Sequence, residues 1–433
     1  MNEAELIEQM VQRLGAEVKN LLSQAKQGQV AAASVERVLR EQLWHFGAQA
    51  LGVVLEGLDR QLIGGRPVRD QRTRTVVCLF GPLDLTRSRC QDGSYPLDEA
   101  LGLLGQRSWT AGVQEAVSLL SCETPFETVA DLMGRLLGVS ISAPSVQVIA
   151  EEAGVRAEAW SQAQLGKDGQ EKLVNPGETL VIPVDGCQAP ERDGWHEVKV
   201  GTLYVNESRC RIGTNRGKLL RKEYLATLEK SEGFGQLLWQ RAQAVGLEQA
   251  GQVVCMGDGA PWIWNLVEMY FPSAVQIVDF YHALEHLWSV GEALWGNRDT
   301  CLATRSWVRH YRKGLKQGRV DLVIGAMERG QELRPKSWSA ESAKTVRLNL
   351  EYFRTNRDRM PYRYYRKLRF PIGTGAVEGS CKFVVQSRFK RPGSRWSHEG
   401  LGRMLALKLA RLNGRWATLW PHLQQEVFFG KVA

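Results

Sequence analysis

Between residues 178 and 294 the hydrophobic pattern switches repeatedly between the two-residue period of strands and the longer period of helices. Strands come first, and strands and helices then alternate. A chain with this order is expected to build a sheet that its own helices cover, which is the α/β class of fold. The predicted strands are 178–184, 195–205, 210–214, 252–256 and 274–278, and the predicted helices are 224–245, 262–270 and 280–294.

Three carboxylates stand beside glycine: Asp185 in Val-Asp-Gly, Asp258 in Gly-Asp-Gly-Ala and Glu378 in Val-Glu-Gly. The first two follow predicted strands, and Glu378 lies early in a helix predicted over 373–391. Glycine lets the backbone turn tightly and keeps bulk away from whatever the carboxylate holds. Carboxylates that converge from separate elements suit Mg²⁺, and two such ions can clamp a phosphodiester between them. The pattern therefore indicates metal-dependent chemistry on nucleic acid.

The order of these elements matches an RNase H-like α/β core, with the first acid on strand one and the second at the end of strand four. Residues 295–370 have helical patterns and many basic side chains, so we expect a helical insertion that interrupts this catalytic core. A mainly helical N-terminal region, expected to bind DNA, precedes the core. The predicted segments are 1–70 (N-terminal helices), 71–175 (hairpin and helix-turn-helix-like region), 176–294 (first part of the core), 295–370 (insertion) and 371–433 (last part of the core and C-terminal helices).

Residues 126–153 are predicted to form a helix, a short glycine-containing turn and a second helix over 145–153. Two interpretations stay open. This shape is that of a helix-turn-helix that reads DNA, but the acidic end of the second helix, at Glu151 and Glu152, fits an ordinary helical hairpin equally well. Elsewhere in the first part of the chain the patterns predict helices at 4–27, 33–63 and 109–121, a hairpin of strands 74–79 and 83–89, and a linker marked by 167–170 and 175–177.

Net charge is distributed unevenly along the chain. The whole protein carries +9, but residues 301–415 contain 27 Lys and Arg against 8 Asp and Glu, a net charge of +19, which leaves −10 for the remainder. Arginine outnumbers lysine in this segment, and tryptophan and tyrosine are interleaved with it. Arginine with aromatic side chains favours phosphate contacts and base stacking, so a nucleic-acid partner is expected.

The remaining composition is that of a soluble intracellular protein. Met1–Glu5 is acidic and polar, so no signal peptide is expected, and no apolar run approaches the ~20 residues of a membrane helix. The 8 cysteines are scattered without a Cys-x-x-Cys pair, which predicts reduced thiols and no structural zinc. We expect a cytoplasmic, nucleoid-associated bacterial protein without a membrane partner.

A further motif follows the second acid, Asp279-Phe280-Tyr281-His282 and then Ala283-Leu284-Glu285-His286. In order, Val-Asp-Gly, Gly-Asp-Gly-Ala-x-Trp, Asp-x-x-His-Ala-x-Glu-His and Gly-Thr-Gly-x-Val-Glu-Gly-x-Cys-Lys resemble the DDE transposases of bacterial insertion sequences. The resemblance is to the ISKra type, which is related to the Mutator and hAT groups. It spans about residues 74–420 and includes the tail 388–397 and Asn413-Gly414-Arg415-Trp416.

The resemblance implies a transposase that cuts and joins double-stranded DNA at the terminal inverted repeats of its element and at target DNA. It implies two Mg²⁺ or Mn²⁺ ions held by Asp185, Asp258 and Glu378, and a dimer or higher oligomer. His282 is expected to act at the scissile phosphate with Asp279 as its partner. The residues expected to contact DNA are Asp279, Lys382, Arg388, Lys390, Arg391, Arg395 and Trp396, the last by stacking on a nucleotide.

The sequence departs from the transposase pattern at one place, and two alternative functions stay open. Relatives often carry Cys-x-x-Cys-Gly before Pro-Leu-Asp-Glu, but here the stretch is Cys90-Gln91-Asp92-Gly93, which removes the basis for a zinc knuckle. One alternative is a domesticated transposase that binds DNA without cutting it. The other is a zinc metalloprotease, because His282-Ala283-Leu284-Glu285-His286 matches His-x-x-Glu-His.

Overall fold

The computed structural model describes residues 3–103, 108–165, 172–213, 216–332 and 339–428. The chain divides into two compact units: unit 1 is Met1–Trp160 with Ala406–Ala433, and unit 2 is Ser161–Leu405. Residues 167–170 of the predicted linker lie outside the described residues. Among the described helices, none is both long enough and apolar enough to cross a membrane.

Unit 1 is mainly helical, as expected for this part of the chain. Two long N-terminal helices precede an antiparallel hairpin, and shorter helices follow, so the helices and the hairpin predicted here are confirmed. The elements are α1 (Glu3–Lys26), α2 (Ala32–Ile63), β1 (Val68–Cys78), β2 (Gly81–Cys90), α3 (Pro96–Ala100), α4 (Ala111–Ser121), α5 (Phe126–Leu137), α6 (Ala143–Ala163) and α17 (Trp416–Phe428).

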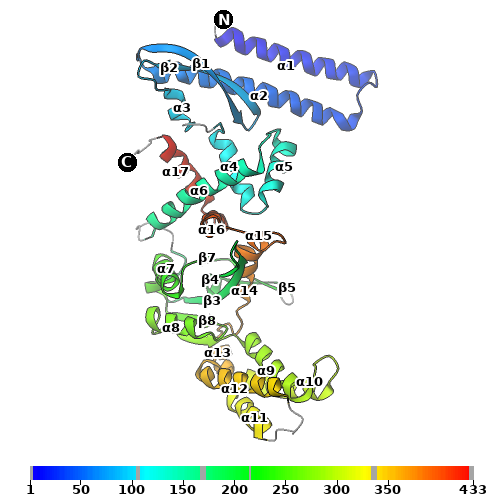
Figure 1. Ribbon diagram of the computed structural model, residues 1–433, viewed down its shortest axis with the longest axis vertical. Coiled ribbons are helices and arrows are strands. Elements are labelled where there is room, and N and C mark those ends of the chain that lie inside the picture. Colours follow the sequence, from blue (N-terminus) through cyan, green and yellow to red (C-terminus); the bar gives the residue numbers. More distant parts are fainter. Residues whose placement is uncertain (1–2, 104–107, 166–171, 214–215, 333–338, 429–433) are drawn as a thin grey trace. The chain divides into compact units, whose positions relative to one another are not determined.

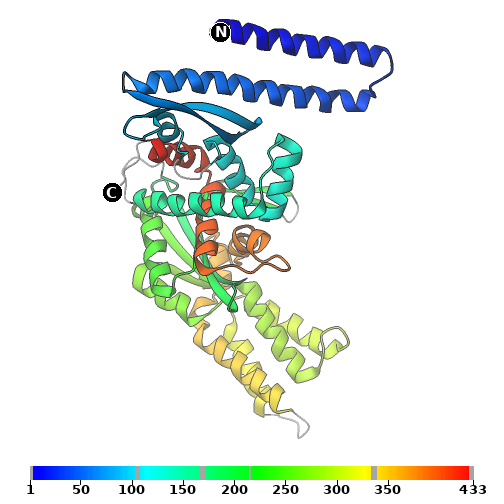
Figure 2. The same cartoon turned by 45° about the horizontal axis from the view of Figure 1, so that its top comes forward.

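The hairpin of unit 1 packs on α2 (Figures 1 and 2), where Leu55 meets Leu85 in a small apolar core. The next helix pair turns at Gly138, whose φ of 65° ends α5. A Cβ at Gly138 would lie 2.6 Å from the ring of Trp44, so glycine is required there. The second helix, α6, has 21 residues and extends well beyond the predicted 145–153. A DNA-reading role for this helix pair stays a prediction.

Unit 2 is built on a five-stranded mixed sheet with the order β7-β4-β3-β8-β9. Three strands form an antiparallel meander, while β8 and β9 run parallel to β3. The strands are β3 (Thr179–Pro190), β4 (Trp195–Val205), β7 (Lys222–Thr227), β8 (Gln252–Gly257) and β9 (Val275–Val278), with a separate pair β5 (Arg209–Gly213) and β6 (Arg216–Leu219).

Two predictions about these strands were wrong, and a third strand was predicted correctly but lies outside the main sheet. Residues 224–245 were expected to form one helix, but the helix begins only at Ser231, and β7 occupies the residues before it because Tyr224, Leu225 and Ala226 pair with β4. The strand expected at 210–214 exists as β5 but pairs with β6 outside the main sheet. In addition, β3 does not end at Asp185 but continues to Pro190.

Helices cover both faces of the sheet, and a helical insertion follows it. The helices predicted over 295–370 are confirmed for the described residues of that range, and their role as an insertion in an RNase H-like core stays a prediction. The helices of unit 2 are α7 (Ser231–Ala244), α8 (Pro261–Tyr270), α9 (Phe280–Trp295), α10 (Leu302–Lys316), α11 (Val320–Glu332), α12 (Ala340–Thr355), α13 (Tyr362–Lys367), α14 (Gly375–Ser380), a π-helical turn η4 (Cys381–Gln386), α15 (Ser387–Phe389) and α16 (His398–Leu412), with short 3₁₀ turns at Asn206–Ser208 (η1), Leu247–Gln249 (η2) and Arg357–Arg359 (η3).

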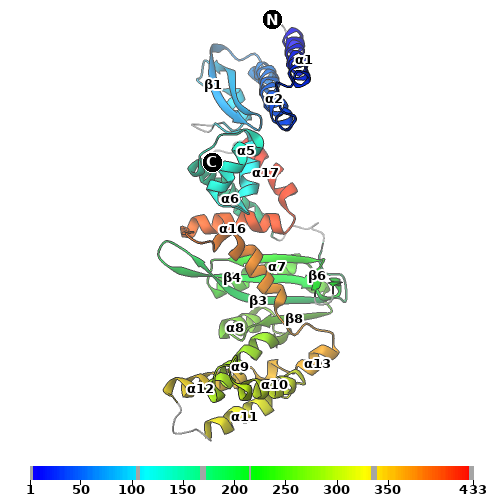
Figure 3. The same cartoon turned by 90° about the vertical axis from the view of Figure 1, so that its right-hand side faces the viewer.

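Successive side chains of a strand point to opposite faces, and this alternation separates the two helix layers. Gly201 of β4 faces Phe234 and Leu238 of α7. Its neighbour Thr202 points the other way and shares a hydrogen bond with Ser380 of α14. Figures 1 and 3 show α7 and α14 on opposite faces of the sheet.

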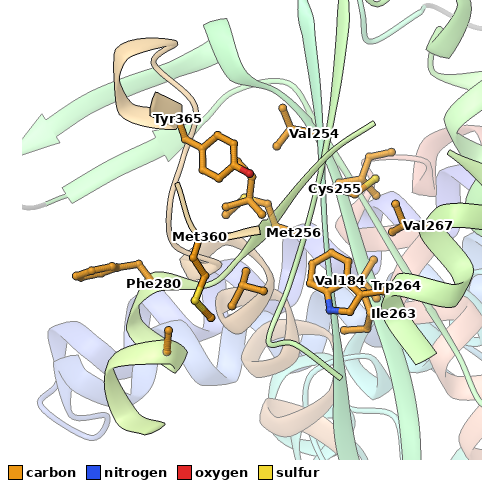
Figure 4. Close-up of a cluster of buried hydrophobic side chains, with 14 of the residues drawn as sticks. Val184, Val254, Cys255, Met256, Ile263, Trp264, Val267, Phe280, Met360 and Tyr365 are labelled. Atoms are coloured by element: carbon orange, nitrogen blue, oxygen red, sulfur yellow. The ribbon is translucent and has the colours of Figure 1, made fainter. Parts of the chain in front are cut away.

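The insertion shares its core with the sheet. Buried side chains of β8, such as Val254 and Met256, belong to the same apolar cluster as Met360 and Tyr365, which lie near the end of the insertion (Figure 4). The phenol of Tyr365 also donates a hydrogen bond of 2.9 Å to the carbonyl of Gln276 in β9. The insertion is therefore packed against the sheet rather than tethered to it.

Candidate active site

Asp185 and Asp258 come from neighbouring parallel strands: Asp185 lies within β3, and Asp258 is the first residue after β8. Pro183 of β3 is aligned with Met256 of β8, and each aspartate follows its aligned residue by two positions. Adjacent strands are about 4.8 Å apart. Burial raises the pKa of the Asp185 carboxyl, the negative charge of Asp258 raises it further, and nearby His282 partly offsets both effects. The structure thus brings together three of the residues singled out from the sequence.

The turn after Asp258 is fixed by the insertion. The Asp258 Oδ1 accepts a hydrogen bond of 2.9 Å from the amide of Ala260, and its main-chain carbonyl accepts one of 2.7 Å from the phenol of Tyr352 in α12. Gly259 has a φ of 109°, and a Cβ there would lie 2.5 Å from the Tyr352 ring. Burial and the negative charges of Asp258 and Asp279 raise the pKa of Tyr352, so the phenol stays protonated as a donor.

Asp279 is a positioning residue. Its side chain is 1% exposed. One carboxylate oxygen accepts hydrogen bonds from the amides of Tyr281 and His282, which caps α9, and the other accepts from the amide and hydroxyl of Thr374, just before α14. Asp279 therefore connects the helix that carries His282 to the one that carries Glu378. A buried carboxylate with both oxygens occupied is not available to DNA, so the predicted DNA contact of Asp279 is corrected.

Replacing this carboxylate is expected to be costly. Asp279→Ala removes a helix cap and leaves buried donors without an acceptor, so we predict a loss of about 2–4 kcal/mol in the free energy of unfolding. Urea denaturation measures it. The matched control is Asp299→Ala, an exposed aspartate that follows α9, which is expected to change the free energy by less than about 0.5 kcal/mol. Equal effects of the two substitutions would contradict the positioning role.

Glu378 is exposed on a helix that packs over β3 and β4. The helix is anchored by the Ser380 contact with Thr202 and by the Cys381 thiol, which donates to Asp185 Oδ2 at 3.6 Å. Cys381 follows Glu378 by three residues, about one helical turn. The ligand atoms of the three acids do not all lie within 4.8 Å of one another. When two ions lie about 3.5–4 Å apart, ligands that bind different ions can be more than 4.8 Å from one another.

Sequence reasoning missed the thiol pair at this site. Cys187 of β3 lies within hydrogen-bonding reach of Cys381, and this contact is the main reason why the pKa of Cys187 is lowered, to about 7. The pKa of Cys381 is raised, first by the same contact and then by burial. Gln386 also donates to the Cys187 sulfur at 3.7 Å. Both cysteines were visible in the sequence, but no spacing signal relates residues nearly two hundred positions apart.

The His-x-x-Glu-His segment does not gather a zinc site in the described part of the chain. The rings of His282 and His286 are 4.9 Å apart, but His286 stacks on Tyr352 at 3.7 Å and its Nδ1 shares a hydrogen bond of 2.6 Å with Asn349. Burial lowers the pKa of His286. No third ligand joins these two histidines among the described residues. The metalloprotease alternative therefore receives no support from this geometry.

One group of described residues does bring three ligand atoms within 4.8 Å: Glu191, Asp193 and His196 at the β3–β4 turn. Internal hydrogen bonds account for it. The His196 Nε2 lies 2.9 Å from Asp193 Oδ1, and His398 Nδ1 lies 3.2 Å from Glu191 Oε2. Because these partners already satisfy one another, the group does not by itself indicate a metal.

The predicted DNA-contacting residues divide into exposed and buried sets. Arg388 is 2% exposed and its guanidinium lies 4.8 Å from the ring centroid of Trp396, which is itself 7% exposed and donates to the carbonyl of Phe389. These two side chains form a buried stack and are not available to a DNA strand, which corrects both predictions. By contrast, Lys382, Lys390 and Arg395 are exposed and Arg391 is half-buried.

An exposed aromatic residue near the predicted basic tail was missed. Trp195, at the start of β4, is 60% exposed, and the Lys390 ammonium lies 5.2 Å from its ring centroid. The main chain holds the two segments together, since Arg192 N donates to the Trp396 carbonyl at 2.9 Å. A tryptophan directly after the turn residues Asp193 and Gly194 was the available signal in the sequence.

Comparisons with known proteins identify the family. The profile of a family described as "Uncharacterised protein family (UPF0236)" matches residues 26–420. A protein of Streptococcus gallolyticus described as "UPF0236 protein in vanSb 3'region" is 24% identical over 380 residues, which cover 84% of this chain and 79% of that protein. The matched range contains Asp185, Asp258, His282 and Glu378, and neither description names an activity. The chain belongs to the UPF0236 family.

Proposed function

We propose that this protein is a DDE transposase that cuts and joins DNA at the terminal inverted repeats of an insertion sequence. The observation that carries the proposal is that Asp185 of β3 and Asp258, directly after the adjacent parallel strand β8, lie near one another and near His282. The strand order adds support, because an antiparallel meander followed by two parallel strands is the order expected of an RNase H-like core. Glu378 supplies the third carboxylate from the helix that crosses β3.

The donor set fits two Mg²⁺ or Mn²⁺ ions. Burial, and to a lesser degree the charge of Asp258, raises the pKa of Asp185, so the ionised pair of aspartates is unfavourable and a divalent cation would stabilise it. Asp185, Asp258 and Glu378 would hold the ions. Bound ions would activate the attacking oxygen and stabilise charge on the leaving oxygen of the phosphodiester.

The surrounding side chains have separate tasks in this proposal. Tyr352 fixes the main chain at Asp258, and Asp279 fixes the start of α9, from which His282, near Asp185, would act at the scissile phosphate. The exposed cations Lys382 and Lys390 follow Glu378 along the chain and would neutralise the phosphates on either side. The transposed strand would then present its 3′-hydroxyl to target DNA at the same carboxylates.

Metal binding has a readout that does not depend on activity. The pKa of Asp185 is raised, so the native state binds the carboxyl proton of Asp185 more tightly than the unfolded chain does. Without metal, the protein is therefore expected to lose stability as pH rises above the ordinary carboxyl range and Asp185 ionises. Mn²⁺ is expected to stabilise the wild type by about 2.7 kcal/mol at one hundred times its Kd, and to do so less as pH falls through the raised pKa. Thermal melts with and without EDTA measure this.

The same thermal melts, carried out on two variants, show which carboxylate binds the metal. Asp185→Asn is expected to melt higher than the wild type in EDTA and to gain little from Mn²⁺. Asp193→Asn, in the group at the β3–β4 turn, is expected to behave as the wild type. Loss of the Mn²⁺ effect in Asp193→Asn alone would place the metal at the turn and contradict the proposed site.

Strand transfer tests the function itself. A duplex that ends in the terminal repeat flanking the gene is incubated with protein, Mg²⁺ or Mn²⁺ and a supercoiled plasmid. The proposal predicts plasmid molecules joined covalently to the 3′ end of the labelled strand. Binding to the repeat without cutting or joining, in either metal, would favour a domesticated DNA-binding protein instead.

A further inference from the structure

Helix α1 carries an apolar stripe that no described part of the chain buries. Four of its large apolar side chains are exposed: Ile7 by 53%, Val11 by 56%, Val18 by 45% and Leu22 by 55%. Their spacings of four, seven and four residues place them on one side of the helix. Among the described side chains of α1, Met10 alone is buried.

Such a stripe is unusual for a helix in water. A helix of 24 residues that buries a single described side chain gains little from packing, although packing is what normally stabilises a helix in a protein. A contiguous exposed apolar stripe with polar borders is typical of a surface that binds a partner. A groove of about 180 Å³ between α1 and α2 borders the stripe at Val18, and its lining mixes apolar residues such as Leu21 with polar ones such as Asn20.

The stripe is complementary to itself. The order of spacings, four, seven and four residues, is the same in both chain directions. When α1 of a second copy runs in the opposite direction, Ile7 therefore lies opposite Leu22 and Val11 lies opposite Val18. The charges of α1 are also unevenly distributed. Residues 3–14 contain Glu3, Glu5, Glu8 and Arg13, a net charge of −2, and residues 15–26 contain Glu17, Lys19 and Lys26, a net charge of +1. Antiparallel pairing sets each acidic half against a basic half and opposes the helix dipoles.

We propose that α1 is a self-association surface, on which α1 of one copy packs antiparallel against α1 of a second copy. Glu8 and Lys19 are eleven residues apart, close to three helical turns, so both border the stripe on the same side. In the antiparallel pair, Glu8 of each copy lies beside Lys19 of the other. The contact is isologous, so it closes on two copies. This inference stands apart from the proposed chemistry, since it rests on α1 alone.

Sedimentation velocity of the full chain tests the surface. The wild type is expected to be a dimer at micromolar concentration, and Val18→Glu is expected to weaken dimerisation at least 100-fold because the charge enters the contact twice. Gln9→Glu adds the same charge to an exposed position on the opposite side of α1 and is expected to leave the dimer unchanged. Because Val18 is exposed, circular dichroism of the variant should match the wild type. A monomeric wild type, or a Val18→Glu protein that remains a dimer, would overturn the proposal.

Cross-linking tests the direction of pairing. A mixture of Val11→Cys and Val18→Cys proteins, treated with a mild thiol oxidant, is expected to form a disulfide-linked dimer of one copy of each. Either variant alone is expected to form no more than the wild type, whose native cysteines set the background. Efficient cross-linking of Val11→Cys alone would mean a parallel pair and would contradict the antiparallel arrangement.

Discussion

Asp258→Asn is expected to abolish metal-dependent DNA cleavage, by ~10³-fold or more, while leaving affinity for the terminal repeat within about threefold of the wild type. Asparagine keeps the oxygen that accepts the amide of Ala260, so the turn after β8 is preserved. The substitution removes the negative charge that a divalent cation needs. Cleavage of a labelled duplex and a fluorescence binding titration on the same preparation measure the two quantities.

A matched substitution makes this result specific. Asp193→Asn changes the same chemical group at an exposed position of the β3–β4 turn and is expected to leave both cleavage and binding unchanged. If Asp258→Asn lost DNA affinity as well as cleavage, the carboxylate would be a structural group and the proposed metal site would be wrong.

The affinity for DNA is expected to depend strongly on salt concentration. Raising the salt concentration from about 50 to 200 mM is expected to weaken DNA binding by about 10³-fold or more, because each phosphate contact releases counterions. The segment 301–415 supplies much of this charge, with a net charge of +19. Lys390→Ala and Arg395→Ala are each expected to reduce the slope of log affinity against log salt by about one.

Two controls accompany the salt titration. Lys230→Ala removes an exposed cation that precedes α7, on the other face of the sheet, and is expected to leave the slope unchanged. Arg388→Ala is expected to lower stability rather than the slope, since Arg388 is buried against Trp396. An affinity that did not respond to salt would contradict a binding surface made of these cations.

Much of the fold followed from local sequence patterns, and the exceptions have a common cause. The strands β3, β4, β8 and β9 were predicted because their apolar runs are bounded by turn residues. The strand β7 was missed because Tyr224, Leu225 and Ala226 form a short apolar run, and such a run does not by itself distinguish a strand from a helix. Its pairing with β4, about twenty residues earlier in the chain, decided the outcome.

The candidate site likewise combines features visible in the local sequence with features that only tertiary contacts decide. Glycine beside Asp185 and Asp258 indicated their importance, but the contacts of Tyr352, Cys187 and Cys381 arise from chain segments far apart in the sequence. Arg388 and Trp396 carry the chemistry of DNA contacts, and tertiary packing buries both. Residue type therefore singled out the carboxylates, whereas burial decides which neighbouring side chains remain exposed for a ligand.

If the three carboxylates act together, Glu378 is the one to substitute, because it is exposed and lies on a separate helix, three residues before the Cys381 that contacts Asp185. The measurement is cleavage of a labelled duplex carrying the DNA that flanks the gene, in Mg²⁺ or Mn²⁺, by wild type and by Glu378→Gln. The wild type is expected to nick the duplex at the repeat ends, and the variant is expected not to. Equal cleavage by both proteins would show that Glu378 is not needed for cleavage and would contradict a site made of three carboxylates.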